Sequence, residues 1–246
     1  LEKLGDLAAI LSNLEPREVL FVDEAPRLNK LVEEVLYPAM ESRKLHLVIG
    51  KGPTARTVSL DLPPFTLIAA TTKVNLLSAP LRSRFGATFK LDYYTEKDIE
   101  AILGRSAKIL KTDITPGAVK ILARASRYTP RTANRLLKRC RDYAQVNSQK
   151  NISEEVALGT LQMLEVDEIG LELPDRRLLE AIIKRFNGGP VGVKALAAAL
   201  NEEAGTIEDV YEPFLMSIGF LHRTPAGRVA AAAAYKHLAL NKEGLV

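Results

Sequence analysis

Two short apolar runs near the start of the chain constrain its fold more than any other feature. The run "VLFV" leads into Asp23 and Glu24, and the run "FTLIAA" leads into Thr71 and Thr72. A helical pattern, "LNKLVEEVLYPAMES", lies between them. Apolar strands separated by helices predict a largely parallel α/β sheet. Functional groups in such sheets gather at the carboxyl ends of the strands, where these four polar residues are expected.

The composition predicts a folded protein without disulfides. The chain has 246 residues, 47% of them hydrophobic, which is enough for one large or several small domains. No apolar run approaches the roughly 20 residues that span a bilayer, and the start of the chain lacks a signal pattern, which favours the cytoplasm. Cys140 is the single cysteine and the three histidines are scattered, so neither an internal disulfide nor a zinc site is expected.

Three blocks divide the chain. Residues 1–94 carry the α/β pattern described above. Residues 95–167 read as four short helices, typical of a small lid domain, with Thr95 and Ser153 as predicted N-caps. The third block, residues 168–246, begins within a linker, "VDEIGLELPD", which ends the lid block.

The third block has the outline of a winged helix. Three helical patterns are followed by the turn "TPAG", which Arg223 and Arg228 flank. Such a helix-turn-helix variant commonly binds duplex DNA, although winged helices also bind protein. Both partner classes remain open from the pattern.

Positive charge is concentrated in one stretch of the lid block. The net charge is only +4, but residues 120–150 contain nine Lys or Arg and a single acid, Asp142. Arg127, Arg131 and Arg135 recur there at helical spacing. The stretch predicts either a surface for polyanions or a solvated helix face.

The acids after the first strand have two interpretations. In the functional one, Asp23 helps to hold magnesium and Glu24 polarises a water that attacks a nucleotide. In the structural one, both residues begin a loop and cap the next helix.

Two arginines also have two interpretations. Arg84 in "LRSRFG" could stabilise negative charge on a neighbouring subunit's phosphoryl group, and Arg131 in "TPR" could reach phosphate from the lid. Alternatively, Arg84 is a surface arginine and Arg131 simply follows Pro130 in the first turn of a helix.

The order of these features resembles the AAA+ ATPases and, among them, the RuvB family of Holliday-junction branch-migration motors. The resemblance covers nearly the whole chain. It rests on long stretches in the same order, among them "FVDE", "VEEVLYPAME", "VIGKGPTARTVSLDLPPFTLIAATT", "LLSAPLRSRFG", "RTANRLLKRCRDYAQV", "GGPVGVKALAAAL" and "YEPFLMSIGFLHRTPAGRVA".

The resemblance implies ATP and Mg²⁺ as cofactors and a role for each candidate residue. Asp23 and Glu24 are implied to be the Walker B acids, with Asp23 also binding the magnesium. Thr72 (or Thr71) is implied to be sensor 1 and Arg131 to be sensor 2. Arg84 is implied to be the arginine finger that acts on the nucleotide of a neighbouring subunit. The hairpin around "IGKGPTARTV" is implied to dock on RuvA, and the family also implies RuvC as a partner and a homo-hexameric ring. The winged helix would track along duplex or junction DNA, with Arg223 and Arg228 touching phosphate.

The sequence departs from the family pattern at several places. Pro26 stands where histidine is usual and is expected to alter the turn beside Glu24. Tyr128 stands where glycine is usual. Ala226 replaces a basic wing residue, so the affinity for DNA should be lower and should depend less steeply on salt concentration.

The sequence also begins after the point where the family has its Walker A loop. We therefore expect a partial sequence whose sheet is incomplete and leaves apolar surface uncovered. By itself the chain is expected to bind duplex DNA in a salt-sensitive manner without turning over ATP.

Two alternatives are weighed against the motor. One is a non-catalytic winged-helix DNA-binding or scaffold protein derived from such a motor. The other is a different AAA+ machine, such as a clamp loader, but the "GKGPTAR" hairpin and the "RTPAGR" wing favour the branch-migration family.

Overall fold

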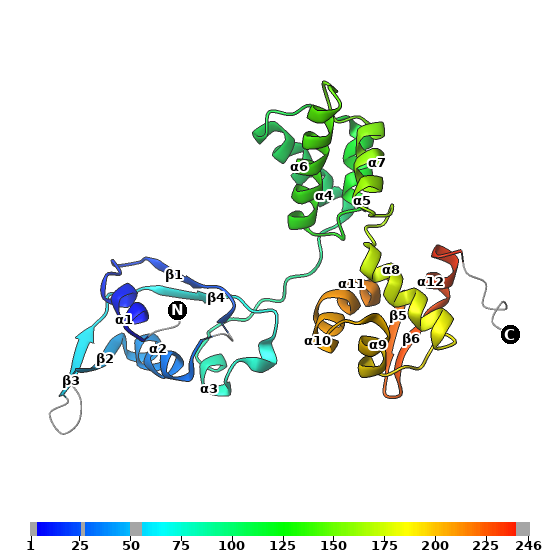
Figure 1. The fold of residues 1–246 in the computed structure, drawn as a ribbon. Coiled ribbons are helices and arrows are strands. Elements are labelled where there is room, and N and C mark those ends of the chain that lie inside the picture. The colour runs from blue at the N-terminus through cyan, green and yellow to red at the C-terminus, as the bar shows by residue number, and fades with distance from the viewer. Residues whose placement is uncertain (1–3, 26–27, 50–55, 240–246) are drawn as a thin grey trace. The chain divides into compact units, whose positions relative to one another are not determined.

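The computed structural model describes residues 4–25, 28–49 and 56–239 (Figure 1). The chain divides into two compact units, Leu1–Leu91 and Asp92–Val246, and each is described by itself below. Within the described ranges, every helix is too short or too polar to cross a membrane.

The first unit is an α/β unit built around two parallel strands. Its elements are α1 (Leu4–Ser12), β1 (Val19–Val22), α2 (Lys30–Ser42), β2 (Lys44–Ile49), β3 (Arg56–Asp61), β4 (Thr66–Ala69), the 3-10 turn η3 (Val74–Leu76) and α3 (Ala79–Arg82). Strand β1 pairs in parallel with β4, with Val22 opposite Ala69. The predicted parallel arrangement of the two apolar strands is therefore confirmed.

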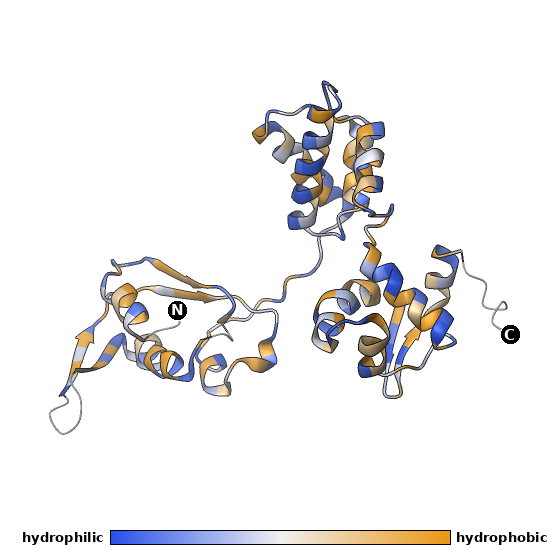
Figure 2. Cartoon of the chain, in the orientation of Figure 1, coloured by the Kyte–Doolittle hydropathy of each residue, from blue (hydrophilic) through white to orange (hydrophobic). Residues whose placement is uncertain are grey.

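The β1–β4 sheet buries one face and exposes the other. Leu20 and Val22 point into a core formed with α1 and α2. Along β1, alternate residues face opposite sides, so Val19 and Phe21 lie on the other face, where each is 58% exposed. Figure 2 shows both strands coloured as hydrophobic. Uncovered apolar surface was expected, and it lies on this face of the sheet.

The predicted hairpin is also present. Strands β2 and β3 are antiparallel, and their register runs from the Lys44–Asp61 pair to the Ile49–Arg56 pair. The tip, residues 50–55, lies outside the described residues, as does Pro26. Val58 and Leu60 of β3 are partly exposed, so the hairpin presents apolar side chains to its surroundings.

The lid part of the second unit consists of four helices around one core. They are α4 (Glu96–Ile109), α5 (Pro116–Arg124), α6 (Pro130–Val146) and α7 (Glu154–Met163). Thr95 and Ser153 cap α4 and α7 as predicted. Cys140 is completely buried in this core, and its burial raises the pKa of the thiol to about 11, so it is a neutral packing residue.

The rest of the second unit has the predicted winged-helix layout. Its elements are α8 (Leu173–Glu180) with the π-helical extension η4 (Ala181–Arg185), α9 (Val193–Leu200), a third helix formed by α10 (Ala204–Thr206), η5 (Ile207–Tyr211) and α11 (Glu212–Ser217), the strands β5 (Leu221–Thr224) and β6 (Gly227–Ala230), and α12 (Ala232–His237). Helix α8 begins at Leu173, with Pro174 in its first turn, so the linker ends earlier than its sequence suggests.

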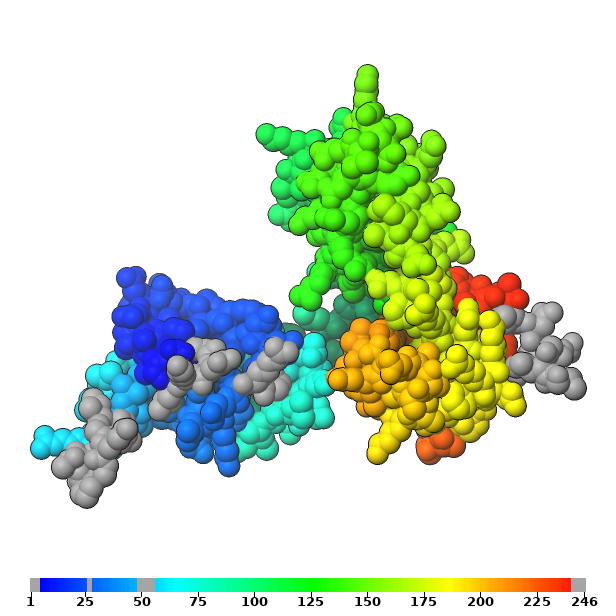
Figure 3. All heavy atoms as spheres, viewed as in Figure 1, coloured from blue at the N-terminus to red at the C-terminus, as the bar shows by residue number. Residues whose placement is uncertain are grey.

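The β5–β6 hairpin forms the wing. Its turn residues, 225–226, are exposed at the surface, and in the space-filling view of Figure 3 the wing appears as a small dark-orange area at the lower edge of the winged helix. Gly227 has a φ of 136°, and an added Cβ would lie 2.5 Å from the Val191 carbonyl oxygen. This position therefore requires glycine, because the backbone of the loop between η4 and α9 packs directly on the wing.

Candidate nucleotide and DNA sites

The polar residues that follow β1 and β4 lie at the same edge of the β1–β4 sheet, as predicted. Beyond the strands, the Ala70 amide donates to the Val22 carbonyl at 2.9 Å, and the Ala25 amide donates to the Ala70 carbonyl at 3.0 Å. These two bonds continue the β1–β4 ladder past its regular end. They hold Asp23 and Glu24 beside Ala70 and the residues that follow it.

Glu24 adopts an unusual backbone conformation. Its φ is 52°, in the left-handed region that non-glycine residues occupy rarely, and its amide donates to the Asp23 carboxylate at 3.0 Å. Strained backbone of this kind clusters at functional sites. The N-cap of α2 is Asn29, whose side chain accepts from the Leu31 amide at 3.1 Å, so the alternative that the two acids cap this helix is not what the structure shows.

The two threonines after β4 differ in their contacts. The Thr71 hydroxyl accepts a hydrogen bond from the Lys73 amide at 2.9 Å, which fixes it to the local turn. Thr72 is the more exposed of the two. Its hydroxyl is therefore the better placed to meet a ligand at the sheet edge.

The donors at this edge suit magnesium in the presence of a nucleotide. Magnesium prefers oxygen ligands and is usually bound by one or two carboxylates together with substrate phosphates, not by a cage of protein groups. Asp23 and Glu24 supply such carboxylates. Across the described residues, no group of three or more His, Cys, Asp and Glu could form a protein cage for a metal ion.

Arg84 is held against α2. Its Nη1 donates to the Pro80 carbonyl at 2.7 Å, and its Nη2 lies 3.0 Å from a Glu41 carboxylate oxygen. The guanidinium also lies over the Tyr37 ring, 4.5 Å from the centroid. The Tyr37 hydroxyl donates to Glu33 at 3.2 Å, so the ring is itself fixed. The arginine is thus oriented by α2 and is not a freely moving surface side chain.

Arg84 and the acids lie at different places in the first unit. Arg84 lines a cleft of about 390 Å³ together with Thr66, at the amino end of β4, and with Glu41 of α2. Thr72 follows the opposite end of the same strand. A strand rises about 3.3 Å per residue, so the two ends of β4 are roughly 10 Å apart. Arg84 therefore lies near the end of β4 opposite to the edge that carries Asp23.

Arg131 occupies the predicted position in the lid. Helix α6 begins at Pro130, and Arg131 is its second residue, with its side chain exposed.

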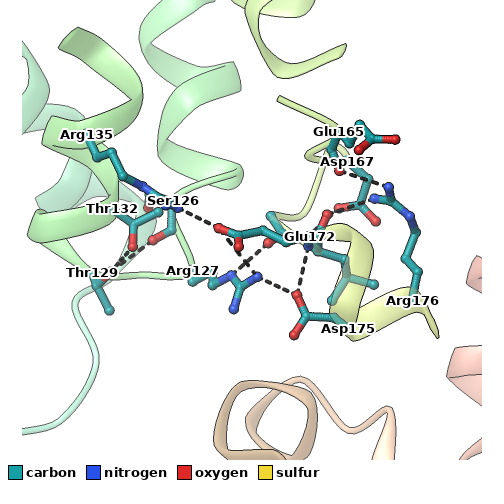
Figure 4. A network of polar contacts seen from close by, with 12 residues as sticks. Ser126, Arg127, Thr129, Thr132, Arg135, Glu165, Asp167, Glu172, Asp175 and Arg176 are labelled. Atoms are coloured by element: carbon teal, nitrogen blue, oxygen red, sulfur yellow. Dashed lines mark hydrogen bonds and ion pairs between the residues drawn. The ribbon is translucent and has the colours of Figure 1, made fainter. Parts of the chain in front are cut away.

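Other arginines of the basic stretch are engaged with carboxylates. Figure 4 shows that Arg127 points from the lid toward Asp175 of the winged helix, with which it forms an ion pair. Arg135 pairs with Glu172 at 2.5 Å. The exposed cationic surface predicted for this stretch is therefore smaller than its nine basic residues suggest.

The two wing arginines differ strongly in exposure. Arg228 is buried, and its guanidinium donates to Glu212 and to Glu208, each at 2.7 Å. These carboxylates raise the pKa of Arg228. Arg223 also pairs with Glu212, but its side chain is 45% exposed. Arg228 therefore acts inside the domain and does not present its guanidinium to a phosphate, contrary to our expectation, whereas Arg223 remains available.

The sequence patterns did not predict these acidic partners of the arginines. Glu41 lies 43 residues from Arg84, Asp175 lies 48 residues from Arg127, and Glu212 lies 16 residues from Arg228. Periodicity describes which face of one helix is buried. It does not report pairs that form only when separate elements pack together.

Comparisons with known proteins agree with the described geometry. Residues 1–91 match the Holliday junction DNA helicase RuvB P-loop domain, residues 94–167 match the RuvB AAA lid domain, and residues 168–239 match the RuvB C-terminal winged helix domain. Together these matches span most of the chain.

Solved structures give the same result. The Holliday junction branch migration motor RuvB of Thermotoga maritima is 46% identical, with a TM-score of 0.82, over 98% of this chain and 76% of that one. A variant of the same motor is also 46% identical, with a TM-score of 0.84, over 98% of this chain and 77% of that one.

The parallel strands, with acids after β1 and threonines after β4, together with the helical lid and the winged helix define the chain as an AAA+ ATPase-type protein. More specifically, the chain belongs to the RuvB family.

Proposed function

We propose that the chain is a subunit of an ATP-driven DNA translocase that migrates Holliday junctions with RuvA during recombination and repair, in the cytoplasm. The observation that carries the proposal is the meeting of Asp23, Glu24 and Thr72 at one edge of the β1–β4 sheet. Nucleotide hydrolysis needs an acid for the metal and a group that orients the attacking water in one place.

Each residue at the edge has a proposed role. Asp23 would hold Mg²⁺ against the phosphates of ATP, and Glu24 would accept a hydrogen bond from the attacking water. Thr72 would contact the terminal phosphate as sensor 1, and Arg131 would contact it from the lid as sensor 2. When bound, the magnesium ion neutralises charge on the phosphate oxygens.

Arg84 would act on the nucleotide of a neighbouring subunit in a homo-hexameric ring. Its position by the amino end of β4 supports this, because that end is remote from the acids of its own subunit. The Glu41 carboxylate that pairs with Arg84 is 59% exposed, whereas the Arg84 side chain is 23% exposed and is also held by the Pro80 carbonyl and the Tyr37 ring. A phosphate would therefore take the place of Glu41 while these other contacts keep the guanidinium oriented.

The winged helix would bind the phosphate backbone of duplex or junction DNA. A translocating motor needs contacts that do not depend on sequence, and arginine contacts to phosphate are of this kind. Arg223 is the proposed contact in the wing because its side chain is exposed. Residues 1–94, 95–167 and 168–246 would serve as ATPase core, lid and DNA-binding domain.

The β2–β3 hairpin would dock on RuvA. Exposed Val58 and Leu60 support this role, because apolar side chains on a projecting hairpin are typical of protein contacts. RuvC is proposed as a further member of the assembly on the family resemblance alone.

The test is ATP-dependent migration of a synthetic four-way junction by the subunit, expressed from its natural gene, in the presence of RuvA. Glu24→Gln should abolish ATP turnover and migration while leaving duplex binding intact. Arg84→Ala subunits should lower turnover when mixed with unchanged subunits. Duplex binding without any ATP turnover by the unchanged subunit would instead support a non-catalytic DNA-binding protein.

A further inference from the structure

The linker between the lid and the winged helix is tied down on its lid side. Gly170 has a φ of 90°, and an added Cβ would lie 2.6 Å from the Ala125 carbonyl oxygen of the lid. Its own carbonyl accepts a hydrogen bond from Arg127 Nε at 2.7 Å. The linker backbone thus packs directly on the turn that joins α5 to α6.

The linker is tied down equally on its winged-helix side. Arg176 of α8 donates to the carbonyls of Leu171 and Glu165, at 2.9 and 2.8 Å (Figure 4). Asp167 accepts from the Leu171 amide at 2.7 Å and lies 2.7 Å from His237 of α12. The backbone polar groups of this segment are therefore used by fixed partners, unlike those of a flexible tether.

Arg127 connects the two sides. Besides Gly170, it pairs with the buried carboxylate of Asp175 in α8, and its guanidinium lies 4.9 Å from the centroid of the Phe214 ring in α11. Asp175 also accepts from the Glu172 amide at 2.8 Å, so the same carboxylate caps α8. One lid side chain thus contacts the linker and two helices of the winged helix.

The turn that carries Arg127 has a demanding backbone. Arg127 and Tyr128 are consecutive left-handed residues, with φ values of 54° and 55°. Glycine adopts such a conformation without cost, whereas tyrosine does not, so surrounding contacts must hold the turn. The contacts of Arg127 with Gly170 and Asp175 supply that restraint.

We propose that Arg127 and residues 165–175 form a latch that holds the lid and the winged helix as one rigid body, with Arg127 as its positioning residue. Arg131 lies four residues further along the chain than Arg127, in the first turn of α6, which begins directly after the turn that carries Arg127. This inference rests on the proposed function: if a nucleotide moves Arg131, the latch transmits that movement from the lid to the wing. The ATPase cycle and DNA movement are then linked mechanically through this turn.

The experiment measures the distance between two spin labels, one on the lid at Lys120→Cys and one on the winged helix at Lys194→Cys. Both positions are exposed, and the native Cys140 is buried, so labelling is selective. The otherwise unchanged chain should give one narrow distance distribution. Arg127→Met should widen it roughly twofold, because relative motion is the default once a domain interface is lost.

Matched variants make the result specific. Arg139→Met removes an arginine whose ion pair with Asp142 lies within α6, and it should leave the distribution unchanged. Arg127→Lys keeps the charge without the planar group and should give an intermediate width. If Arg127→Met does not fold, the double variant Arg127→Met, Asp175→Asn avoids an unpaired buried charge. An unchanged width in the folded variant, single or double, overturns the latch.

The latch and the proposed function can fail separately. The label experiment contains neither nucleotide nor DNA, so its outcome does not depend on ATP turnover. In the natural subunit, Arg127→Met should slow branch migration while ATP turnover and duplex affinity persist. A parallel fall in turnover and migration would contradict the mechanical role of the latch.

Discussion

Two arginine clusters of the second unit have similar ion pairs, but one connects elements of a single domain and the other connects two domains. Arg228 joins the wing to the third helix within one hydrophobic core, through Glu212 and Glu208. Arg127 joins the lid core to the winged-helix core, through Asp175 and Gly170. The first cluster therefore maintains the fold of a domain, whereas the second maintains the relation between two domains. A buried ion pair between arginine and a carboxylate therefore stabilises one domain when both partners belong to it, and fixes two domains to each other when the partners belong to different domains.

The largest effect should come from Arg228→Met. Glu212 is fully buried, and breaking a buried ion pair costs on the order of 3 kcal/mol because a charge is left without its partner. Calorimetry should show a clearly lower melting temperature for the winged helix. A melting temperature equal to that of the unchanged chain would show that Arg223 alone satisfies Glu212, and the contrast between the clusters would weaken.

Arg127→Met should cost about 2 kcal/mol at neutral pH, since Arg127 keeps some exposure while Asp175 is buried. Burial raises the pKa of Asp175, and the charge of Arg127 opposes that rise. Without Arg127 the pKa rises further, so the folded variant binds a proton more readily than the unfolded chain does. Its stability should therefore increase as the pH falls from 7 toward 5.

Comparison of melting curves for the variant and the unchanged chain across this pH range tests the effect. Glu172 is the other carboxylate near Asp175, and it is present in both proteins. A stability cost that stays constant with pH would mean that Asp175 is not the group left unpaired.

Arg223→Ala should affect binding more than stability. Its side chain is half exposed, and the buried Glu212 keeps its ion pair with Arg228 after the change, so the cost in free energy of unfolding should be only about 1 kcal/mol. Loss of one phosphate contact should reduce the steepness of the plot of log association constant for duplex DNA against log salt concentration by about 0.9. Fluorescence anisotropy with duplex DNA at several salt concentrations measures this slope. An unchanged slope would exclude Arg223 as a phosphate contact.

Thr95→Ala gives the smallest effect and a purely local reference. The Thr95 hydroxyl accepts from the Asp98 amide at 3.2 Å, and loss of such a cap costs about 1 kcal/mol. The Thr95 hydroxyl also donates to the Asp98 carboxylate, and its hydrogen bonds lower the pKa of Asp98, so this charge-linked part of the stabilisation is lost as the pH falls through the lowered pKa. Thermal unfolding at decreasing pH should therefore show a cost that becomes smaller but does not vanish, because the bond from the Asp98 amide to the Thr95 hydroxyl does not depend on the charge of Asp98.

Much of the architecture was predictable because it follows from local rules. The apolar runs before Asp23 and Thr71 form parallel strands, Thr95 and Ser153 cap their helices, and Pro130 begins α6. The caps, the start of α6 and the strand character of each apolar run depend on residues close together in the chain, and the parallel pairing follows from the helical pattern between the two runs. The alternation of strands and helices then places Asp23, Glu24 and Thr72 at one sheet edge.

The use of each arginine was not predictable in the same way. Sequence alone indicates that Arg84, Arg127 and Arg228 are cationic, and it suggested phosphate partners for Arg84 and Arg228. Tertiary packing decided that Arg84 lies on Tyr37, that Arg127 enters the lid–winged-helix junction and that Arg228 is buried. The physical reason is that an ion pair depends on distance in space, and the carboxylates in question approach only after separate elements have packed. The sequence by itself determined which groups are charged and where the backbone turns, and only the tertiary structure decided which charges remain free to meet a ligand.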